Sequence, residues 1–257
     1  MPNRIVFATN KGGTGKTSST AMCAWILAAA GYKVLAVDLD SQGNLTRMLT
    51  GDSIYKHSGK TIMEAIEAGD AEPYIYNASL SLDLIPAEDR LAAFARHIYT
   101  SKVGNPYAVL QRLLAPIEDR YDYVFVDVGP SLGDESVNAI VYADKIIVPV
   151  DGGDLAMEAL LRFKEFVDTT RAEGHTNAEI FGILVTMRDR RSNYEKDVSA
   201  GLREIFGDLV FDTEVGRRVK IKEMSARGID ITDPAISDYF ALTEEIIERI
   251  NREGVKT

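Results

Sequence analysis

A glycine-rich stretch directly after an apolar run constrains this chain more than any other part of it. Residues 4–8 read Arg-Ile-Val-Phe-Ala, residues 10–17 read Asn-Lys-Gly-Gly-Thr-Gly-Lys-Thr, and a helix-forming segment follows. A strand, a glycine-rich turn and a helix N-terminus in this order aim backbone N–H groups at one point, where the helix dipole favours an anion. The stretch therefore predicts a phosphate-binding loop; the alternative is a solvated glycine-rich turn.

The residue types in this loop indicate a triphosphate and a metal ion. In the pattern G-x-x-x-x-G-K-[ST] the lysine reaches the β- and γ-phosphates and the hydroxyl ligates Mg²⁺, which assigns these roles to Lys16 and Thr17. The chain departs from the pattern because Asn10 replaces the first glycine and Lys11 adds a second cation. We expect ATP and Mg²⁺ as ligands. The predicted nucleotide-binding residues of the loop are Lys11, Gly12, Gly13, Thr14, Gly15, Lys16, Thr17 and Ser18.

The whole chain fits one α/β domain. Its 257 residues, 46% of them hydrophobic, are enough for a full core, and we expect a single domain over residues 1–257 with no helix-turn-helix domain ahead of it. Neither a run of 18 apolar residues nor a signal-peptide pattern is present, so we expect a cytoplasmic protein. The single cysteine, Cys23, excludes a four-cysteine iron–sulfur dimer and is expected to fill the core.

Buried-strand runs alternate with helical patterns along the chain. This order predicts an α/β P-loop NTPase fold with a mostly parallel twisted sheet, helices on both faces and ligands at the carboxyl ends of the strands. The predicted strands cover residues 4–8, 33–38, 80–85, 121–127, 145–150, 179–187 and 209–215, and the predicted helices cover residues 18–30, 61–68, 88–99, 107–117, 154–170 and 235–252.

Three carboxylates stand at the ends of predicted strands. Asp38 and Asp40 close the strand over residues 33–38, and Asp127 closes the strand over residues 121–127. A carboxylate near the γ-phosphate can hold the attacking water or a metal-bound water. The alternative for Asp38 and Asp40 is an exposed turn with two solvated acids.

Several motifs in order resemble the deviant Walker A ATPases, the family of the ParA partition proteins and the MinD proteins. The resemblance runs from residue 4 to about residue 250. Residues 11–17 match K-G-G-x-G-K-[ST], residues 38–44 resemble D-x-D-P-Q-x-N, residues 127–133 resemble D-x-P-P-S-L-G, residues 186–193 resemble T-M-x-D-x-R-[TS]-N, and residues 216–225 resemble P-R-N-V-R-L-x-E-A-P. Ser41, Gly129, Gly216 and Arg218 depart from these patterns.

The resemblance implies roles for individual residues. In the family the first lysine of the loop crosses a dimer interface to the partner's nucleotide, so Lys11 implies an ATP-sandwich homodimer. Asp40 would position the attacking water and Asp38 would lie in the outer shell of the metal. The implied catalytic residues are Lys11, Lys16 and Asp40, and the implied metal-binding residues are Thr17, Asp38 and Asp127.

Two positions near the nucleotide base also follow from the resemblance. Pro149 stands where the family's backbone approaches the base, and Arg218 stands where the family has an asparagine that faces adenine. We therefore expect both residues to contribute to nucleotide binding.

The charge distribution restricts where DNA contacts can lie. The formal net charge is −10, which disfavours a general nucleic-acid coat. Residues 186–227, however, contain ten Lys/Arg and eight Asp/Glu, whereas the remainder contains 19 and 31. We expect DNA binding in this region, with ordinary solvated side chains as the alternative. The predicted DNA-binding residues are Arg188, Arg190, Arg217, Arg218, Lys220 and Lys222.

The resemblance implies a partition-type ATPase. Two ATP-bound subunits would bind DNA non-specifically, associate with the nucleoid, and release DNA after hydrolysis stimulated by a ParB-like centromere-binding partner. Two alternatives remain: an ATPase that positions a membrane-associated complex or another cargo, and a metabolic ATP-dependent synthetase. Residues 251–257 do not resemble the lysine-rich amphipathic helix of the membrane-binding proteins, so we expect no membrane partner.

Overall fold

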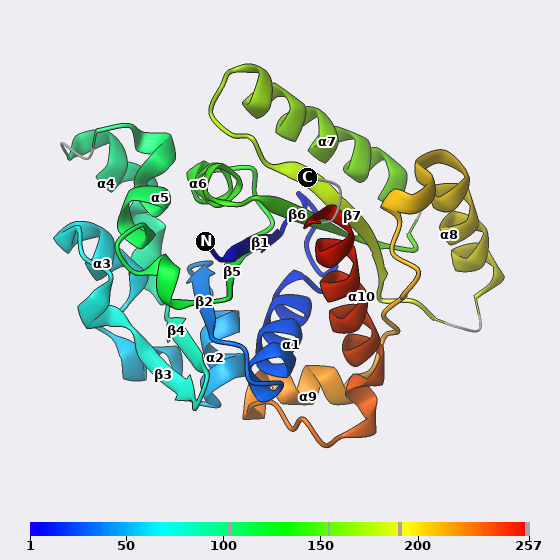
Figure 1. The fold of residues 1–257 in the computed structure, drawn as a ribbon, viewed down its shortest axis with the longest axis horizontal. Helices are drawn as coiled ribbons and strands as arrows, with labels where there is room; N and C mark the ends of the chain where they lie inside the picture. Colours follow the sequence, from blue (N-terminus) through cyan, green and yellow to red (C-terminus); the bar gives the residue numbers. More distant parts are fainter. Residues whose placement is uncertain (102–103, 154, 190–191, 255–257) are drawn as a thin grey trace.

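A seven-stranded sheet forms the centre of the molecule (Figure 1). The computed structural model describes residues 1–101, 104–153, 155–189 and 192–254. The strand order is β3-β4-β2-β5-β1-β6-β7, and every neighbouring pair is parallel except the β3–β4 hairpin. The predicted mostly parallel sheet is confirmed. The strands are β1 Asn3–Phe7, β2 Val34–Leu39, β3 Tyr76–Ser79, β4 Leu82–Ile85, β5 Tyr123–Val128, β6 Lys145–Asp151 and β7 Glu179–Thr186.

Helices cover both faces of this sheet. The α-helices are α1 Lys16–Ala29, α2 Asn44–Thr50, α3 Ile62–Ala68, α4 Phe94–Thr100, α5 Val109–Leu114, α6 Asp134–Tyr142, α7 Ala156–Ala172, α8 Asn193–Phe206, α9 Val219–Arg227 and α10 Ser237–Gly254. Single 3-10 turns are Ile54–His57, Glu72–Tyr74, Asp89–Ala93, Pro106–Ala108, Glu118–Arg120, Gly207–Leu209 and Pro234–Ile236.

The core consists of two apolar layers, one on each face of the sheet. Successive side chains of a strand point to opposite faces, so Val6 of β1 enters the layer with α3 to α8, whereas Ile5 and Phe7 enter the layer with α1, α2, α9 and α10. Because both faces are covered, the central strands are apolar without alternation, as in β2 and β5. This double burial explains why they were recognisable in the sequence, whereas the half-exposed edge strand β3 was not.

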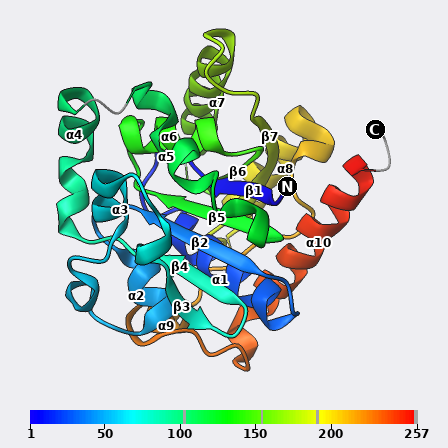
Figure 2. The same cartoon turned by 60° about the vertical axis from the view of Figure 1, so that its left-hand side comes forward.

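Helices α2 and α9 lie side by side although about 175 residues separate them in the chain (Figures 1 and 2). Gly51, which ends α2 with φ 70°, approaches the carbonyl of Arg227 at the end of α9 so closely that a β-carbon on it would lie 3.3 Å from the carbonyl oxygen. The contact places α9 beside the loop that follows β2.

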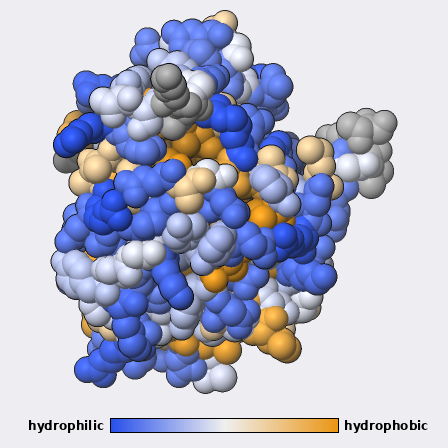
Figure 3. Space-filling model, turned by 90° about the vertical axis from the view of Figure 1, so that its left-hand side faces the viewer, coloured by the Kyte–Doolittle hydropathy of each residue, from blue (hydrophilic) through white to orange (hydrophobic). Residues whose placement is uncertain are grey.

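Helices α3, α4 and α5 belong to the layer on the other face of the sheet from α2 and α9. Figure 3 shows this side of the molecule, where hydrophilic residues cover most of the surface and apolar residues appear in recesses between them. No helix within the described ranges is long and apolar enough to cross a membrane.

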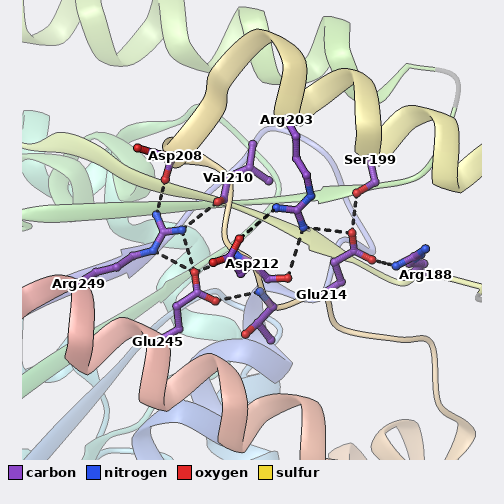
Figure 4. Close-up of polar contacts among 10 residues, drawn as sticks. Arg188, Ser199, Arg203, Asp208, Val210, Asp212, Glu214, Glu245 and Arg249 are labelled. Atoms are coloured by element: carbon purple, nitrogen blue, oxygen red, sulfur yellow. Dashed lines mark hydrogen bonds and ion pairs between the residues drawn. The ribbon is translucent and has the colours of Figure 1, made fainter.

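The predicted strand over residues 209–215 is wrong. The segment forms only an isolated bridge with β7, between Val210 and Ile183, although the N–H groups of Phe211 and Val215 donate to the carbonyls of Ile183 and Val185, each at 2.9 Å. Between these two contacts, a side chain of α10 takes the hydrogen bonds (Figure 4): Glu245 accepts from the backbone N–H groups of Asp212 and Thr213 at 2.9 and 2.8 Å. Arg249 donates to the carbonyls of Asp208 and Val210 at 2.9 and 2.8 Å, so α10 and β7 share the backbone groups of this segment and no continuous ladder forms.

Several helices differ from their predicted ranges or were not predicted. The predicted helices over residues 88–99 and 107–117 each begin with a 3-10 turn, and Asn105 accepts a hydrogen bond from the N–H of Tyr107 at 3.0 Å to start the second. Helices α2, α6, α8 and α9 and strand β3 were not predicted. For α8 a sequence signal existed, because Ser192 and Glu195 have capping-box spacing and the Ser192 hydroxyl accepts from the N–H of Glu195 at 3.2 Å.

Candidate nucleotide-binding site

The glycine-rich loop connects β1 to α1 at the carboxyl edge of the sheet. Gly13 and Gly15 have φ values of 76° and 80°, which residues with a β-carbon rarely adopt, and Gly15 is the N-cap of α1. The Thr186 hydroxyl at the end of β7 donates to the carbonyls of Thr14 and Val150 at 2.8 and 3.3 Å. The loop is therefore fixed to the ends of β6 and β7.

Lys16 is held over the loop. Its side chain is buried and its Nζ donates to the carbonyl of Lys11 at 2.9 Å. Burial lowers the pKa of Lys16, and the carboxylates of Asp127 and Asp40 oppose that shift. The ammonium group thus stands at the helix N-terminus, where it can meet a phosphate.

A cavity of about 420 Å³ opens beside the loop. Asp40 lines it near Pro130, and the Asp40 carboxylate accepts from the N–H of Gln42 at 3.0 Å. A β-carbon on Gly129 would lie 3.4 Å from the Asp40 carboxyl carbon, so the residue in the family's proline position packs directly on this acid. The lining residues are Gly12, Gly13, Thr14, Gly15, Lys16, Thr17, Ser18, Asp40, Gln42, Asn44, Val128, Pro130, Met187 and Ser225.

Asp38 and Asp127 lie side by side on β2 and β5, and both are fully buried. Asp38 accepts from the N–H and hydroxyl of Thr46 at 2.8 and 2.7 Å and from the N–H of Asp40 at 3.2 Å. Burial raises the pKa of Asp38 to about 7 despite these bonds. The two groups form a buried pair of carboxyls at the ends of β2 and β5, and burial disfavours the ionised form of both.

Both carboxylate oxygens of Asp127 are shielded from solvent and lack a hydrogen bond of ordinary geometry to any described residue. Burial and then the neighbouring Asp38 raise the pKa of Asp127, while the Thr17 hydroxyl lowers it. A divalent cation would neutralise this pair, and Mg²⁺ prefers oxygen ligands and retains several waters, so it needs few protein groups. Thr17, Asp38 and Asp127 therefore fit a Mg²⁺ site.

Lys11 points away from the cavity. Its Nζ pairs with Asp151 Oδ1 at the end of β6, at 2.7 Å, and both side chains are partly exposed. Gly153 lies close to this pair, since a β-carbon on it would be 3.3 Å from the Lys11 Nζ. In this chain alone, Lys11 is bound to its own subunit.

Pro149 and Arg218 do not reach the cavity. Pro149 is buried inside β6, where it pairs with Leu184 of β7. Arg218 is the N-cap of α9 and its guanidinium contacts both carboxylate oxygens of Asp238 at 3.1 Å. Met187 and Ser225 line the cavity instead. Both lie in stretches that the sequence comparison singled out, Met187 in the T-M motif over residues 186–193 and Ser225 at the end of the motif over residues 216–225, but neither was predicted to line the site.

The predicted DNA-binding residues fall into two groups. Arg188 pairs with Glu214, which also accepts from Ser199 at 2.5 Å and Arg203 at 3.2 Å (Figure 4). Like Arg218, Arg188 thereby neutralises a largely buried acid.

The second group is exposed around α9 and consists of Arg217, Lys220 and Lys222. Lys220 pairs with Glu223 at 3.2 Å, and in the part of the chain that the structure describes Arg217 and Lys222 have no ion-pair partner. Arg190 lies outside the described residues.

The chain is a P-loop nucleoside triphosphatase by its fold and site. It has a phosphate-binding loop between a parallel strand and a helix, and a buried acid at the end of β5. The chain matches the model of an AAA domain family, AAA_31, over residues 3–180. It is 36% identical over 253 residues to an uncharacterized protein of Mycobacterium tuberculosis, covering 95% of this chain and 78% of that protein.

Two further relatives have names that state a role. The chain is 32% identical over 252 residues to the chromosome-partitioning ATPase Soj of Thermus thermophilus, covering 96% of both chains. It is 30% identical over 255 residues to the chromosome partitioning protein ParA of Caulobacter vibrioides, covering 95% of this chain and 94% of that protein. The chain belongs to the ParA/MinD-type partition ATPase family.

Solved structures share the fold. A candidate plasmid partition protein of Borrelia burgdorferi bound to AMPPNP has 25% identity and a TM-score of 0.79, covering 98% of this chain and 99% of that one. McdA of Cyanothece has 24% identity and a TM-score of 0.83, covering 97% and 100%. Cobyrinic acid a,c-diamide synthase of Mycobacterium smegmatis with ADP and magnesium has 23% identity and a TM-score of 0.83, covering 98% and 96%.

Proposed function

We propose that this chain is a cytoplasmic ATPase that dimerises with ATP, binds DNA non-specifically, and drives plasmid or chromosome partition with a ParB-like partner. The observation that carries the proposal is the buried Lys16 over the loop, together with the buried Asp127 carboxyl, which lacks a hydrogen bond of ordinary geometry among the described residues. Lys16 can bind a phosphate and Asp127 can bind a metal ion, and both lie near the N-terminus of α1, as binding of ATP with Mg²⁺ requires. The names of the Soj and ParA relatives support the partition role.

The residues at the site divide the work of hydrolysis. Lys16 and the loop N–H groups hold the β- and γ-phosphates, and Asp40, at the mouth of the cavity, orients the attacking water. Thr17, Asp38 and Asp127 would hold Mg²⁺, which would neutralise the charge that develops on the phosphate oxygens. The protein forms no covalent bond to the phosphate in this reaction, so the rate of ATP hydrolysis depends on how these groups are positioned.

Lys11 supports dimerisation as part of the function. Its ion pair with Asp151 leaves the Nζ partly exposed, so the side chain can exchange this partner for the nucleotide of a second subunit. A second cation would stabilise the transferring phosphoryl group. We infer that the Lys11–Asp151 pair opens when the ATP-bound dimer forms.

The DNA surface is best assigned to the exposed cations around α9. Arg217, Lys220 and Lys222 face solvent. Arg188 and Arg218 instead pair with Glu214 and Asp238, so their charges are neutralised within the chain. In a dimer two copies of these three cations would contact one DNA duplex.

ATP-dependent retention of random duplex DNA tests the proposal. The parent should shift DNA in a gel with ATP and fail to do so with ADP. Lys222→Glu should abolish the shift while ATP-dependent dimerisation, followed by light scattering, persists. The matched control is Lys164→Glu, which reverses an exposed lysine on α7 paired with Asp168 at 2.5 Å and should leave DNA binding intact. Equal retention by Lys222→Glu would exclude α9 as the DNA surface.

A metabolic ATP-dependent synthetase is the second candidate, because the fold also matches the M. smegmatis synthase bound to ADP and magnesium. Such an enzyme needs no ATP-dependent DNA binding. Absence of DNA retention, together with ATP turnover that requires a small carboxylate, would favour this function. Absence of both would favour an ATPase that positions a cargo other than DNA.

A further inference from the structure

Met187 is the one non-glycine residue with a positive φ among the residues that the structure describes. Its φ is 55°, in the left-handed region, directly after the last residue of β7. A side chain with a β-carbon is strained there, and such a conformation persists only where the surroundings impose it. Strained positions of this kind occur preferentially at functional sites.

The strained backbone directs the Met187 side chain onto the phosphate-binding loop. Its terminal methyl carbon lies 3.0 Å from the position that a β-carbon on Gly15 would occupy. Gly15 has a φ of 80° and is the N-cap of α1, so it determines where the first N–H groups of that helix point. Met187 also lines the nucleotide cavity.

Both neighbours of Met187 are held in place. On one side the Thr186 hydroxyl binds the carbonyls of Thr14 and Val150 at 2.8 and 3.3 Å. On the other side the N–H of Arg188 donates to Val215 at 3.2 Å, and the Arg188 side chain pairs with a largely buried acid. Thr186 and Arg188 are therefore both fixed, and the backbone changes direction between them at Met187, which adopts the left-handed conformation.

We propose that Met187 is a positioning residue for the nucleotide site. Its left-handed backbone presses the flexible thioether against Gly15 and holds the loop in the conformation that receives the phosphates. The inference rests on the proposed function, because it assumes that ATP binds at this loop. The backbone strain at Met187 is tolerated because it fixes the phosphate-binding loop in its binding conformation before ATP arrives.

Three substitutions separate backbone strain from the side-chain contact. Met187→Gly removes both, Met187→Ala keeps the strain but removes the contact, and Met187→Leu restores an apolar contact. Affinity for mant-ATP, KM and kcat for ATP, and Tm without nucleotide are measured for each. We expect affinity for mant-ATP to fall about tenfold in the glycine and alanine variants, with KM rising much more than kcat falls.

The glycine variant should keep the parent's Tm or exceed it, because relief of strain compensates for the lost contact. The leucine variant should recover most of the affinity that the alanine variant loses. The matched control is Met157→Ala on α7, whose partly buried side chain packs on the core away from the cavity. This control should lower Tm and leave mant-ATP affinity unchanged.

Two results would overturn the inference: mant-ATP binding by Met187→Gly within about twofold of the parent, or a fall in Tm as large as that of Met157→Ala. Lys16→Ala distinguishes this failure from failure of the proposed function. If the parent binds mant-ATP and Lys16→Ala does not, the loop is the nucleotide site and only the role of Met187 is in question. If Lys16→Ala binds as well as the parent, the proposed function fails and the inference fails with it.

Discussion

At the scale of single residues, the two lysines of the phosphate-binding loop have different partners. The Lys16 Nζ binds a carbonyl of the loop itself, whereas the Lys11 Nζ binds Asp151, 140 residues away in the chain. Lys16 is therefore in place for a phosphate, and Lys11 is held until another partner competes with Asp151.

Asp40 should be needed for hydrolysis but not for ATP binding. It lies at the cavity wall and does not contact the loop through any hydrogen bond that we find among the described residues. Asp40→Ala should therefore retain ATP affinity and dimerisation while hydrolysis falls by roughly 10²- to 10⁴-fold, the usual contribution of a residue that positions or deprotonates water. Phosphate release and nucleotide affinity measured on the same preparation check this. Turnover close to that of the parent would show that another group holds the water.

Removing the partner of Lys11 should strengthen the dimer. In Asp151→Asn the partly exposed ion pair no longer competes with the second subunit's nucleotide. Such pairs contribute about 0.2 to 1 kcal/mol after solvent screening, so the dimer Kd should fall by about 1.4- to fivefold for each Lys11 that is released. Analytical ultracentrifugation with AMPPNP measures this Kd. Asp168→Asn, which breaks an exposed pair on α7, is the control; a Kd that rises only in Asp151→Asn would contradict the prediction.

At the scale of elements, α10 determines the conformation of residues 208–215. Glu245 and Arg249 are one turn apart on α10, largely buried, and bound to each other at 2.8 Å, and together they satisfy two N–H and two carbonyl groups of this segment. The Arg249 guanidinium also lies 4.2 Å from the centre of the Phe211 ring. Two side chains of α10 thus share the backbone hydrogen bonds of this segment with β7.

Loss of Glu245 should destabilise the protein without affecting nucleotide affinity. Glu245→Ala leaves the N–H groups of Asp212 and Thr213 without their acceptor and Arg249 without its anion. The cost in free energy of unfolding should be about 1.5 to 3 kcal/mol, the usual contribution of hydrogen bonds to a charged group. Urea unfolding measures it. Glu248→Ala, one turn away in an exposed pair with Arg252, should cost less than about 0.5 kcal/mol, and equal losses in both variants would contradict the assigned role.

At the scale of the whole molecule, a net charge of −10 opposes DNA binding, and the exposed cations around α9 must act against that background. Affinity for DNA should consequently depend strongly on salt, with a slope of log K against log [salt] of about −0.9 for each phosphate contact. Three cations from each of two subunits predict a slope near −5 by the same rule. Titrations of a fluorescent random duplex with ATP at several salt concentrations measure the slope. A slope near zero would exclude phosphate contacts as the basis of retention.

The sequence by itself determined six of the seven strands, the phosphate-binding loop and the strand-end acids Asp38 and Asp127. These features are local: a doubly covered parallel strand is a continuous apolar run, and a phosphate-binding loop needs its glycines and its lysine at fixed spacing. The segment over residues 209–215 looked like a strand for the same local reason, but it forms only an isolated bridge with β7, because α10 supplies the hydrogen bonds of its middle part.

Only the tertiary structure decided which partner each charged side chain has and which backbone is strained. Lys11 pairs with Asp151, Arg188 with Glu214 and Arg218 with Asp238, and these partners lie 140, 26 and 20 residues apart. A cation that meets a partly buried acid of its own chain is indistinguishable in the sequence from one that faces solvent, because the local pattern does not specify distant contacts. The left-handed turn at Met187 likewise arises from fixed contacts on both of its sides, which exist only once β6, β7 and the phosphate-binding loop have come together.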